Sequence, residues 1–275
     1  MAFSVNTNAG AFIALQNLNT TTSQLNKTQN AINTGLKVSS AKDNAAVFAI
    51  AQNLRSDVGG LNAVKQSLDR AIGAADVALA AGGAVSDLLI EMKEKAVAAA
   101  DSGLDTASRT ALNDDFVQLR DQITSIVGNA EFNGTNAVEN GGDDIVGITN
   151  DTGTTDITIA AQDLSLTGAN VTLTAGSTIS TATNAAAVVT AIETSLSNVN
   201  SALSKLGSGA KRLEMQQSFV TKLSDSIETG IGNLVDADLA KESAKLQSLQ
   251  VKQQLGIQAL SIANQAPGTV LGLFR

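Results

Sequence analysis

The chain has 275 residues, a formal net charge of −8 and a pI near 4.5, and 43% of its residues are hydrophobic. It contains no cysteine and no histidine, which excludes disulfides, thiolate chemistry, zinc sites and histidine-based acid–base catalysis. The acidic balance and the lack of a basic cluster argue against nucleic acid as a partner. Aromatic residues make up only 3% of the chain and there is one proline, so the alanine-rich apolar content predicts closely packed helices.

Membrane insertion and cleaved secretion are not predicted from sequence patterns. We find no run of eighteen strongly apolar residues, so we expect no membrane partner. The N-terminal segment lacks the positive region and compact apolar run of a cleaved secretory signal. These observations alone predict a cytoplasmic protein.

The first 26 residues carry no charged side chain, Lys27 being the first. Apolar and small polar residues nevertheless recur with the three-and-four spacing of one helical stripe, and Thr34-Gly35 supplies a stop. The stripe is too thin to stabilise a helix alone, so this helix either docks on the rest of the chain or orders only against neighbouring subunits. Both alternatives stay open. The stripe consists of Leu15, Leu18, Thr22, Leu25, Gln29 and Ile32.

A much longer seam spans Val47–Ala99. Its positions follow the three-and-four spacing throughout, with Asp57 as the one charged exception. Ser40-Ala-Lys-Asp43 fits a capping box at its start. The glycine pair at 82–83 predicts close backbone packing, although a break into two helices is the alternative. At about 1.5 Å per residue the seam would be about 80 Å long, and it needs an equally long partner.

A shorter helix and a turn-rich insert follow. Residues 101–103 form a turn, an amphipathic helix runs from Leu112 to about Gly128, and Asn133-Gly134 is a strong turn dipeptide. From 138 to 183 the composition changes to Gly, Thr, Asp and Ser, and two period-two segments, 156–159 and 171–174, predict strands. We therefore expect a small, solvent-exposed β insert on a helical body.

The acidic run at 141–144, with Asn150-Asp151 nearby, could suggest a calcium site. Its spacing matches no EF-hand loop, so solvated turns are the preferred interpretation. No cofactor and no metal are predicted.

The second long seam spans Val189–Leu234, with Asn184 as its expected cap. It matches the first seam in length and is its expected antiparallel partner. A final amphipathic segment opens at Asp236 and is expected to end at Pro267. No charged side chain lies between Lys252 and Arg275, which mirrors the uncharged first 26 residues. Because both ends carry little charge, we predict that they meet each other in a buried place, as in a polymer with a core.

Several short motifs, in the same order along the chain, resemble those of bacterial flagellin. The resemblance covers roughly 1–137 and 185–275. The motifs are Val5-Asn-Thr-Asn8, Asn17-Leu18, Thr34–Ala46, Ala49-Ile-Ala51, Glu131–Thr135, Ala263–Pro267 and Val270–Leu273.

The resemblance implies a mainly α protein that polymerises into the flagellar filament for motility. It implies terminal helices (1–42 and 235–275) that pair as a coiled coil in the filament core and order on assembly. A long helical bundle (43–137 and 184–234) would form the surrounding tube, and 138–183 a small surface domain. The expected core residues are Leu15, Leu18, Leu25, Ile32, Leu246, Leu249, Leu260, Val270, Leu271 and Leu273. The expected bundle seam comprises Leu54, Leu61, Leu68, Leu89, Leu196, Leu203, Leu213 and Val220.

The resemblance also implies partners and a location outside the cell. The partners are other copies of the chain, hook-associated and cap proteins, the flagellar export apparatus and an export chaperone. Export through that apparatus requires no cleaved signal, which revises the cytoplasmic prediction. One segment departs from some family members: Glu91-Met-Lys93 and Lys95 replace the pattern recognised by an animal toll-like receptor, which opposes docking there.

Three other functions are compatible with parts of the sequence. A signalling hairpin would share the long seams but would need neither a β insert nor uncharged ends. An enzyme is the weakest alternative, because the nearest motif, Gly207–Arg212, lacks the Gly-Lys-Ser/Thr ending of a phosphate loop. The runner-up is a hook–filament junction protein, a structural relative with similar ends.

Overall fold

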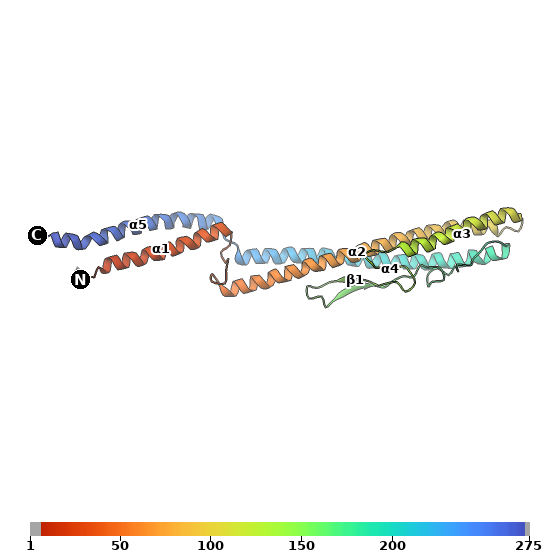
Figure 1. Cartoon of the computed structure of the whole chain (residues 1–275), viewed down its shortest axis with the longest axis horizontal. Helices are drawn as coiled ribbons and strands as arrows, with labels where there is room; N and C mark the ends of the chain where they lie inside the picture. Colours follow the sequence, from red (N-terminus) through yellow and green to blue (C-terminus); the bar gives the residue numbers. More distant parts are fainter. Residues whose placement is uncertain (1–6, 273–275) are drawn as a thin grey trace. The chain divides into compact units, whose positions relative to one another are not determined.

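The computed structural model describes residues 7–272, with side chains through Gln265. It confirms a mainly α fold with a small β insert (Figure 1). The chain forms two compact units: unit 1 is Met1–Ser56 with Ser226–Arg275, and unit 2 is Asp57–Asp225. The elements are α1 (Ala9–Thr34), α2 (Ala45–Ala99), α3 (Thr106–Asn129), β1 (Ile145–Ile148), β2 (Asp156–Ile159), α4 (Ala182–Val235) and α5 (Leu239–Gly272).

Helix α1 begins and ends at residues suited to those positions. The Asn8 side chain accepts a hydrogen bond from the Ala11 amide at 3.0 Å and so caps the first turn. Gly35 follows the last residue with φ of 73°, a left-handed conformation that glycine adopts without a Cβ clash. The predicted stop at Thr34-Gly35 is confirmed.

The connector between α1 and α2 corrects the predicted capping box. The Asp43 carboxylate accepts hydrogen bonds from Ser39 and Ser40, but these residues form a turn that precedes the helix. The cap of α2 is Asn44, whose Oδ1 accepts from the Val47 amide at 3.2 Å. An Asx side chain one residue before the helix reaches the free amides directly, whereas Ser40 lies too far upstream.

Helix α2 is continuous over 55 residues, so the alternative of a break at the glycine pair is wrong. A Cβ added to Gly82 would lie 2.7 Å from Leu203 Cδ2, so a leucine side chain, and not a second backbone as predicted, packs against this glycine. Nothing lies within 4 Å of the corresponding position at Gly83. Only the first glycine of the pair is therefore required by packing.

Within unit 2, α2 and α4 pack antiparallel, as the two seams predict. Lys93 Nζ lies 2.9 Å from Glu193 Oε1, Gly82 meets Leu203, and Asp69 accepts a hydrogen bond from Gln217. As the residue number rises along α2, it falls along α4. Buried side chains recur along both helices, including Leu68, Val85 and Leu89 on α2 and Ile192, Leu206 and Leu213 on α4.

Helix α3 packs back on the end of α2. Arg109 Nε donates to the Ala99 carbonyl at 3.0 Å, and Lys95 pairs with Asp115 at 3.1 Å. The Asp115 carboxylate raises the pKa of Lys95. Phe116 and Ile123 are fully buried, so the predicted amphipathic helix is confirmed.

Two predicted helix boundaries are wrong. Thr181, not Asn184, caps α4: its Oγ1 accepts from the Asn184 amide at 3.2 Å, and the helix begins at Ala182. The last helix does not end at Pro267, because α5 continues to Gly272. A proline removes one amide donor and disfavours a helix interior, but a stop at that residue is not obligatory.

The insert contains one predicted strand, and the other predicted strand is wrong. Strand β2 is present and pairs antiparallel with β1, which the sequence reading missed. Residues 171–174 make only an isolated bridge, between Val171 and Leu166. The Asn133-Gly134 turn is confirmed, since both residues have positive φ, 52° and 84°.

The insert has an exposed side, with Val146 50% exposed, and a buried side. Ile145, Leu164 and Ile179 are buried. A Cβ on Gly147 would lie within 3.0 Å of Leu213 and Leu68, so β1 lies directly on α4 and α2. The insert is part of the core of unit 2.

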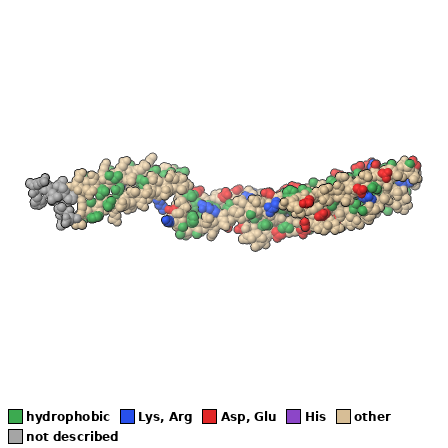
Figure 2. All heavy atoms as spheres, viewed as in Figure 1, with side chains coloured by type: hydrophobic (Ala, Val, Ile, Leu, Met, Phe, Trp, Pro, Cys, Tyr) green, Lys and Arg blue, Asp and Glu red, His purple; other side chains and the backbone are tan. Residues whose placement is uncertain are grey.

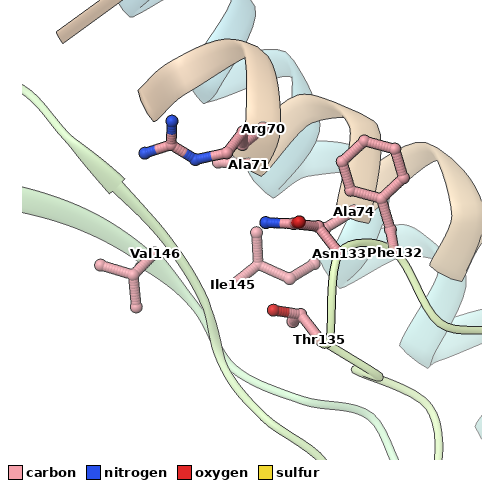
Figure 3. Close-up of a pocket in the computed structure, with 8 residues that line it drawn as sticks. All are labelled: Arg70, Ala71, Ala74, Phe132, Asn133, Thr135, Ile145 and Val146. Atoms are coloured by element: carbon pink, nitrogen blue, oxygen red, sulfur yellow. The ribbon is translucent and has the colours of Figure 1, made fainter. Parts of the chain in front are cut away.

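Figure 3 shows the junction where the insert leaves the helices. The Phe132 ring lies beside α2, and a Cβ on Gly73 would be 2.8 Å from its Cζ. Ile145 points toward Ala71 and Ala74, while Val146 points away, as alternate residues of a strand must. These residues line a small cavity of about 100 Å³.

One stretch of α2 is apolar enough to cross a membrane by length and composition alone, which the sequence reading did not expect. Its mean hydropathy over 18 residues is 1.5, and 39% of that window is buried inside the protein. Core helices of proteins outside membranes meet the same criterion. Ala75, Ala78 and Val85 of α2 are buried in unit 2.

Candidate self-assembly surface

The two weakly charged ends of the chain pair with each other in unit 1. Helices α1 and α5 run antiparallel (Figure 1): Asn8 Nδ2 donates to the Ala263 carbonyl at 2.6 Å, and Gln253 Nε2 reaches Thr22 Oγ1 at 3.5 Å. At the other end of the pair, the Ala237 amide donates to the Gly35 carbonyl at 2.8 Å. The ends meet as predicted, and their burial in the core of a polymer stays a prediction.

The predicted stripe supplies much of the contact between these helices. A Cβ on Gly256 would lie 3.3 Å from Leu18 Cδ1, so the helices approach closely at that point. Leu25 and Leu249 are buried. Of the other expected core residues with described side chains, Leu15 is exposed, and Leu18, Ile32, Leu246 and Leu260 are half-buried. The side chains of Val270, Leu271 and Leu273 lie outside the described part.

A second set of large apolar side chains points outward from the same pair. Ile262 is 70% exposed and Phe12 is 63% exposed, and four more residues are more than half exposed. The sequence analysis did not predict this set, because the predicted contact residues of α1 lie along one helical stripe. The available signal was the density of large apolar residues off that stripe in an almost uncharged segment. We call this set the outer apolar face; it consists of Phe12, Ile13, Val251, Leu255, Ile257 and Ile262.

The outer apolar face is unfavourable in water. Burying each of these side chains would contribute about 1.5–3 kcal/mol. Figure 2 shows hydrophobic side chains over the α1–α5 pair and acidic side chains mainly over unit 2. Large exposed apolar side chains concentrated on one pair of helices indicate an interaction site.

Electrostatics favour burying this surface. Lys27 is the single charged residue of α1, and the sequence of α5 has no charged residue after Lys252. Desolvation of charges is the main cost of covering a polar surface, and burial here would desolvate few charges.

The expected bundle seam lies in α2 and α4. Leu61, Leu68, Leu89, Leu213 and Val220 are buried, and Leu54, Leu196 and Leu203 are half-buried. Leu203 lies directly against Gly82. These residues pack inside the subunit, and none belongs to the outer apolar face.

Side chains in and near the acidic run of the insert accept hydrogen bonds from backbone amides. Asp144 Oδ1 accepts from the Ala161 amide at 2.8 Å, and Asn150 Oδ1 accepts from the amides of Thr154 and Thr155. Within residues 7–272 there is no group of three or more acidic side chains placed to hold a metal ion.

Comparison with known proteins gives matches over nearly the whole chain. Residues 5–140 match the model of the bacterial flagellin N-terminal helical region, and residues 189–274 match that of the C-terminal helical region. Flagellin FljM of Caulobacter vibrioides is 51% identical over 272 residues, covering 99% of this chain and 98% of that protein.

Two solved structures are similar in fold. The crystal structure of Bacillus cereus flagellin gives a TM-score of 0.50 at 24% identity, covering 56% of this chain and 88% of that chain. A Vibrio parahaemolyticus protein provisionally described as flagellar hook-associated gives a TM-score of 0.59 at 12% identity, covering 70% of this chain and 100% of that chain. At these identities both comparisons show the fold alone.

The long packed helices and the outer apolar face define a helical structural protein suited to self-association. The family matches make this class specific. The chain belongs to the bacterial flagellin family.

Proposed function

We propose that this chain is the structural subunit of a bacterial flagellar filament used for swimming, and that it polymerises through its terminal helices. The observation that carries the mechanism is the outer apolar face on the α1–α5 pair, which has large apolar side chains and almost no charge. Copies of the chain would remove this surface from water by packing their α1–α5 pairs together.

In this mechanism the terminal helices order as they assemble. The inner stripe alone gives α1 few buried residues, Leu25 and Thr28. An isolated pair of helices this weakly buried gains little over the entropy of ordering, whereas assembly adds burial of the outer apolar face. Folding and binding are therefore coupled.

The rest of the subunit has different tasks in this proposal. Residues 43–137 and 184–234 would form the filament tube around a core of α1–α5 pairs, held in shape by the α2–α4 seam. The exposed side of the insert, including Thr152–Thr154, would face the medium. Its Ser and Thr hydroxyls would be available for O-glycosylation, which an intact mass above 28.0 kDa would reveal.

The proposed location is the extracellular filament. We expect delivery through the flagellar export apparatus with an export chaperone, and contacts with hook-associated and cap proteins at the filament ends. We expect no enzymatic activity. Matches to flagellin models over both helical regions favour a filament subunit over a hook–filament junction protein.

The test is seeded polymerisation followed by electron microscopy. The wild-type chain should form long filaments, and Ile262→Asp should not, because it places a charge on the outer apolar face. The conservative variant Ile262→Leu should form filaments like the wild-type chain. Val146→Asp, at a half-exposed position on β1, is the control in unit 2 and should assemble.

The outcomes separate function from mechanism. Failure of the wild-type chain to form filaments with seeds would contradict the proposed function. Normal filaments from Ile262→Asp would contradict the proposed role of the outer apolar face and leave the function standing.

A further inference from the structure

Unit 1 contains a basic groove between α1 and the connector that follows it. Three lysines line it around a single carboxylate, and the remaining lining is mostly small and polar, as in Ser23 and Asn30. Its volume is about 340 Å³. We call it the lysine groove and define it by Lys27, Lys37, Lys42 and Asp43.

The Asp43 carboxylate in the groove already has hydrogen-bond and ion-pair partners within the chain. Asp43 Oδ2 accepts hydrogen bonds from the amides of Ser39 and Ser40 at 3.2 and 3.1 Å, and its Oδ1 lies 3.7 Å from Lys27 Nζ. Lys37 Nζ donates to the Asn233 carbonyl at 3.0 Å, a neutral acceptor. Lys42 is exposed. The groove therefore has an excess of positive charge.

The two units of the chain differ in the sign of their charge. Unit 1 contains eight Lys and Arg against five Asp and Glu, and unit 2 contains ten against 21. The net charges are thus +3 and −11, which together give the −8 of the whole chain. The overall acidic balance conceals a basic unit.

Many carboxylates of unit 2 lie at its surface. The ion pairs described within unit 2 use Glu193, Asp115 and Asp121. Many others are exposed, such as Asp87 and Glu91 on α2. Unit 2 thus presents excess negative charge to any neighbour.

We propose that the lysine groove of one copy binds exposed carboxylates on unit 2 of a second copy. This contact rests on the proposed function, since it requires that copies assemble. Charge complementarity identifies the occupant: each copy carries both the basic groove and the acidic surface, and a polymer holds them at high local concentration. Pairing unit 1 with unit 2 is attractive and pairing unit 2 with unit 2 is repulsive, so the contact sets the orientation of neighbours.

The direct test is zero-length carbodiimide crosslinking, which joins a lysine amine to a carboxylate that it contacts. Filaments are grown from an equal mixture of ¹⁴N- and ¹⁵N-labelled full-length chain, and crosslinked peptides are identified by mass spectrometry. Mixed-isotope crosslinks between a groove lysine and an acidic residue of 57–225 are expected. Their absence, or groove crosslinks confined to one isotope or to acids of unit 1, overturns the proposal.

Matched charge reversals provide a second readout. At about 50 mM salt Lys42→Glu should slow elongation about tenfold, because attraction between exposed charges sets encounter rates at low ionic strength. Lys42→Arg should elongate normally. The control is Arg55→Glu, which makes the same charge change in unit 1 outside the groove. At about 500 mM salt the difference between the two reversals should disappear through screening.

The result that counts against the groove is equal slowing by Lys42→Glu and Arg55→Glu, which indicates net charge alone. If wild-type filaments form and Lys42→Glu elongates normally at low salt, the groove contact is overturned and the filament function stands. If the wild-type chain itself forms no filaments, the proposed function fails first, and the groove contact fails with it.

Discussion

Asn8 and Ala263 are 255 residues apart in the sequence and are joined by a hydrogen bond of 2.6 Å from the Asn8 side-chain amide. The same side chain caps α1 through its oxygen. One residue therefore both starts the first helix and attaches it to the last.

The two roles of Asn8 can be separated by substitution. Asn8→Asp keeps the capping oxygen but removes the donor to Ala263, so α1 should still begin at Ala9 while the α1–α5 pair weakens. Asn8→Ala loses both roles and should destabilise unit 1 further, by about 1–2 kcal/mol for the cap. Hydrogen exchange of amides 9–14 and 257–263 in filaments measures both effects. Equal protection in all three proteins would contradict the assignment.

Thr28 is buried, 1% exposed, and its hydroxyl has no hydrogen-bond partner among the described residues. An unsatisfied buried hydroxyl costs about 1–3 kcal/mol. Thr28→Val removes this group at nearly constant volume and should raise the melting temperature of filaments. The control is Thr20→Val at an exposed position, where the hydroxyl donates to the Gln16 carbonyl; it should change the melting temperature little. A lower melting temperature for Thr28→Val would contradict the prediction.

The adjacent glycines of α2 should respond differently to alanine. Gly83→Ala meets no atom within 4 Å and gains helix propensity, so it should stabilise unit 2 by about 1 kcal/mol. Gly82→Ala must displace Leu203, whose Cδ2 would be 2.7 Å away, so overpacking of about 1–3 kcal/mol offsets or exceeds the gain. Urea unfolding of the soluble chain gives the order of stability. If the Gly82→Ala variant were as stable as the Gly83→Ala variant, or more stable, the helices would separate easily at that point.

Removing the insert should unfold part of unit 2. Ile145, Leu164 and Ile179 are buried, and losing each would forfeit about 1.5–3 kcal/mol of apolar burial. Deleting residues 145–179 should therefore reduce the helical signal of the soluble chain. Replacing residues 151–154, all exposed, with a turn of equal length should leave both helicity and filaments unchanged. A fully helical, assembling deletion variant would show that the insert is dispensable.

Acid should weaken the connector through Asp43. Hydrogen bonds from Ser39 and Ser40 lower the pKa of this carboxyl below its ordinary value of 3.8. A lowered folded-state pKa stabilises the native chain above the unfolded value, and that contribution is lost as pH falls from about 4 through the folded value. Asp43→Asn should make hydrogen-exchange protection at Ser39 and Ser40 independent of pH across this window. Unchanged acid sensitivity in the variant would assign the effect to other carboxyls.

The sequence predicts the helical framework well because each helix follows a regular spacing. The α2 and α4 seams, the Gly35 stop and the Asn133-Gly134 turn all rest on local chemistry that a sequence displays. The cap at Thr181 was missed because neighbouring Thr and Asn residues are both suitable caps, and only the backbone path selects one. Strand β1 was missed because its pairing partner decides it, and the short run of Ile145–Ile148 includes a glycine.

The candidate assembly surface could be predicted only in part. Uncharged ends show that burial is favourable, and they led to Leu25 and Leu249. Which face remains uncovered depends on how α1 and α5 are rotated against each other, a tertiary property. The exposure of Phe12 and Ile262 is therefore known only from the structure, although the sequence shows that both residues are large and apolar. The charge difference between units also requires the unit boundaries.

The pairing of the first helix with the last has a consequence for folding kinetics. Unit 2 can form from segments close in sequence, such as α2 with α3, but the α1–α5 pair must close a loop of more than 200 residues, as the separation of Asn8 and Ala263 shows. Contacts of such high sequence separation form late, because loop-closure entropy precedes any gain. The body of the chain can therefore form before the α1–α5 pair, which leaves the terminal helices to be completed as copies assemble.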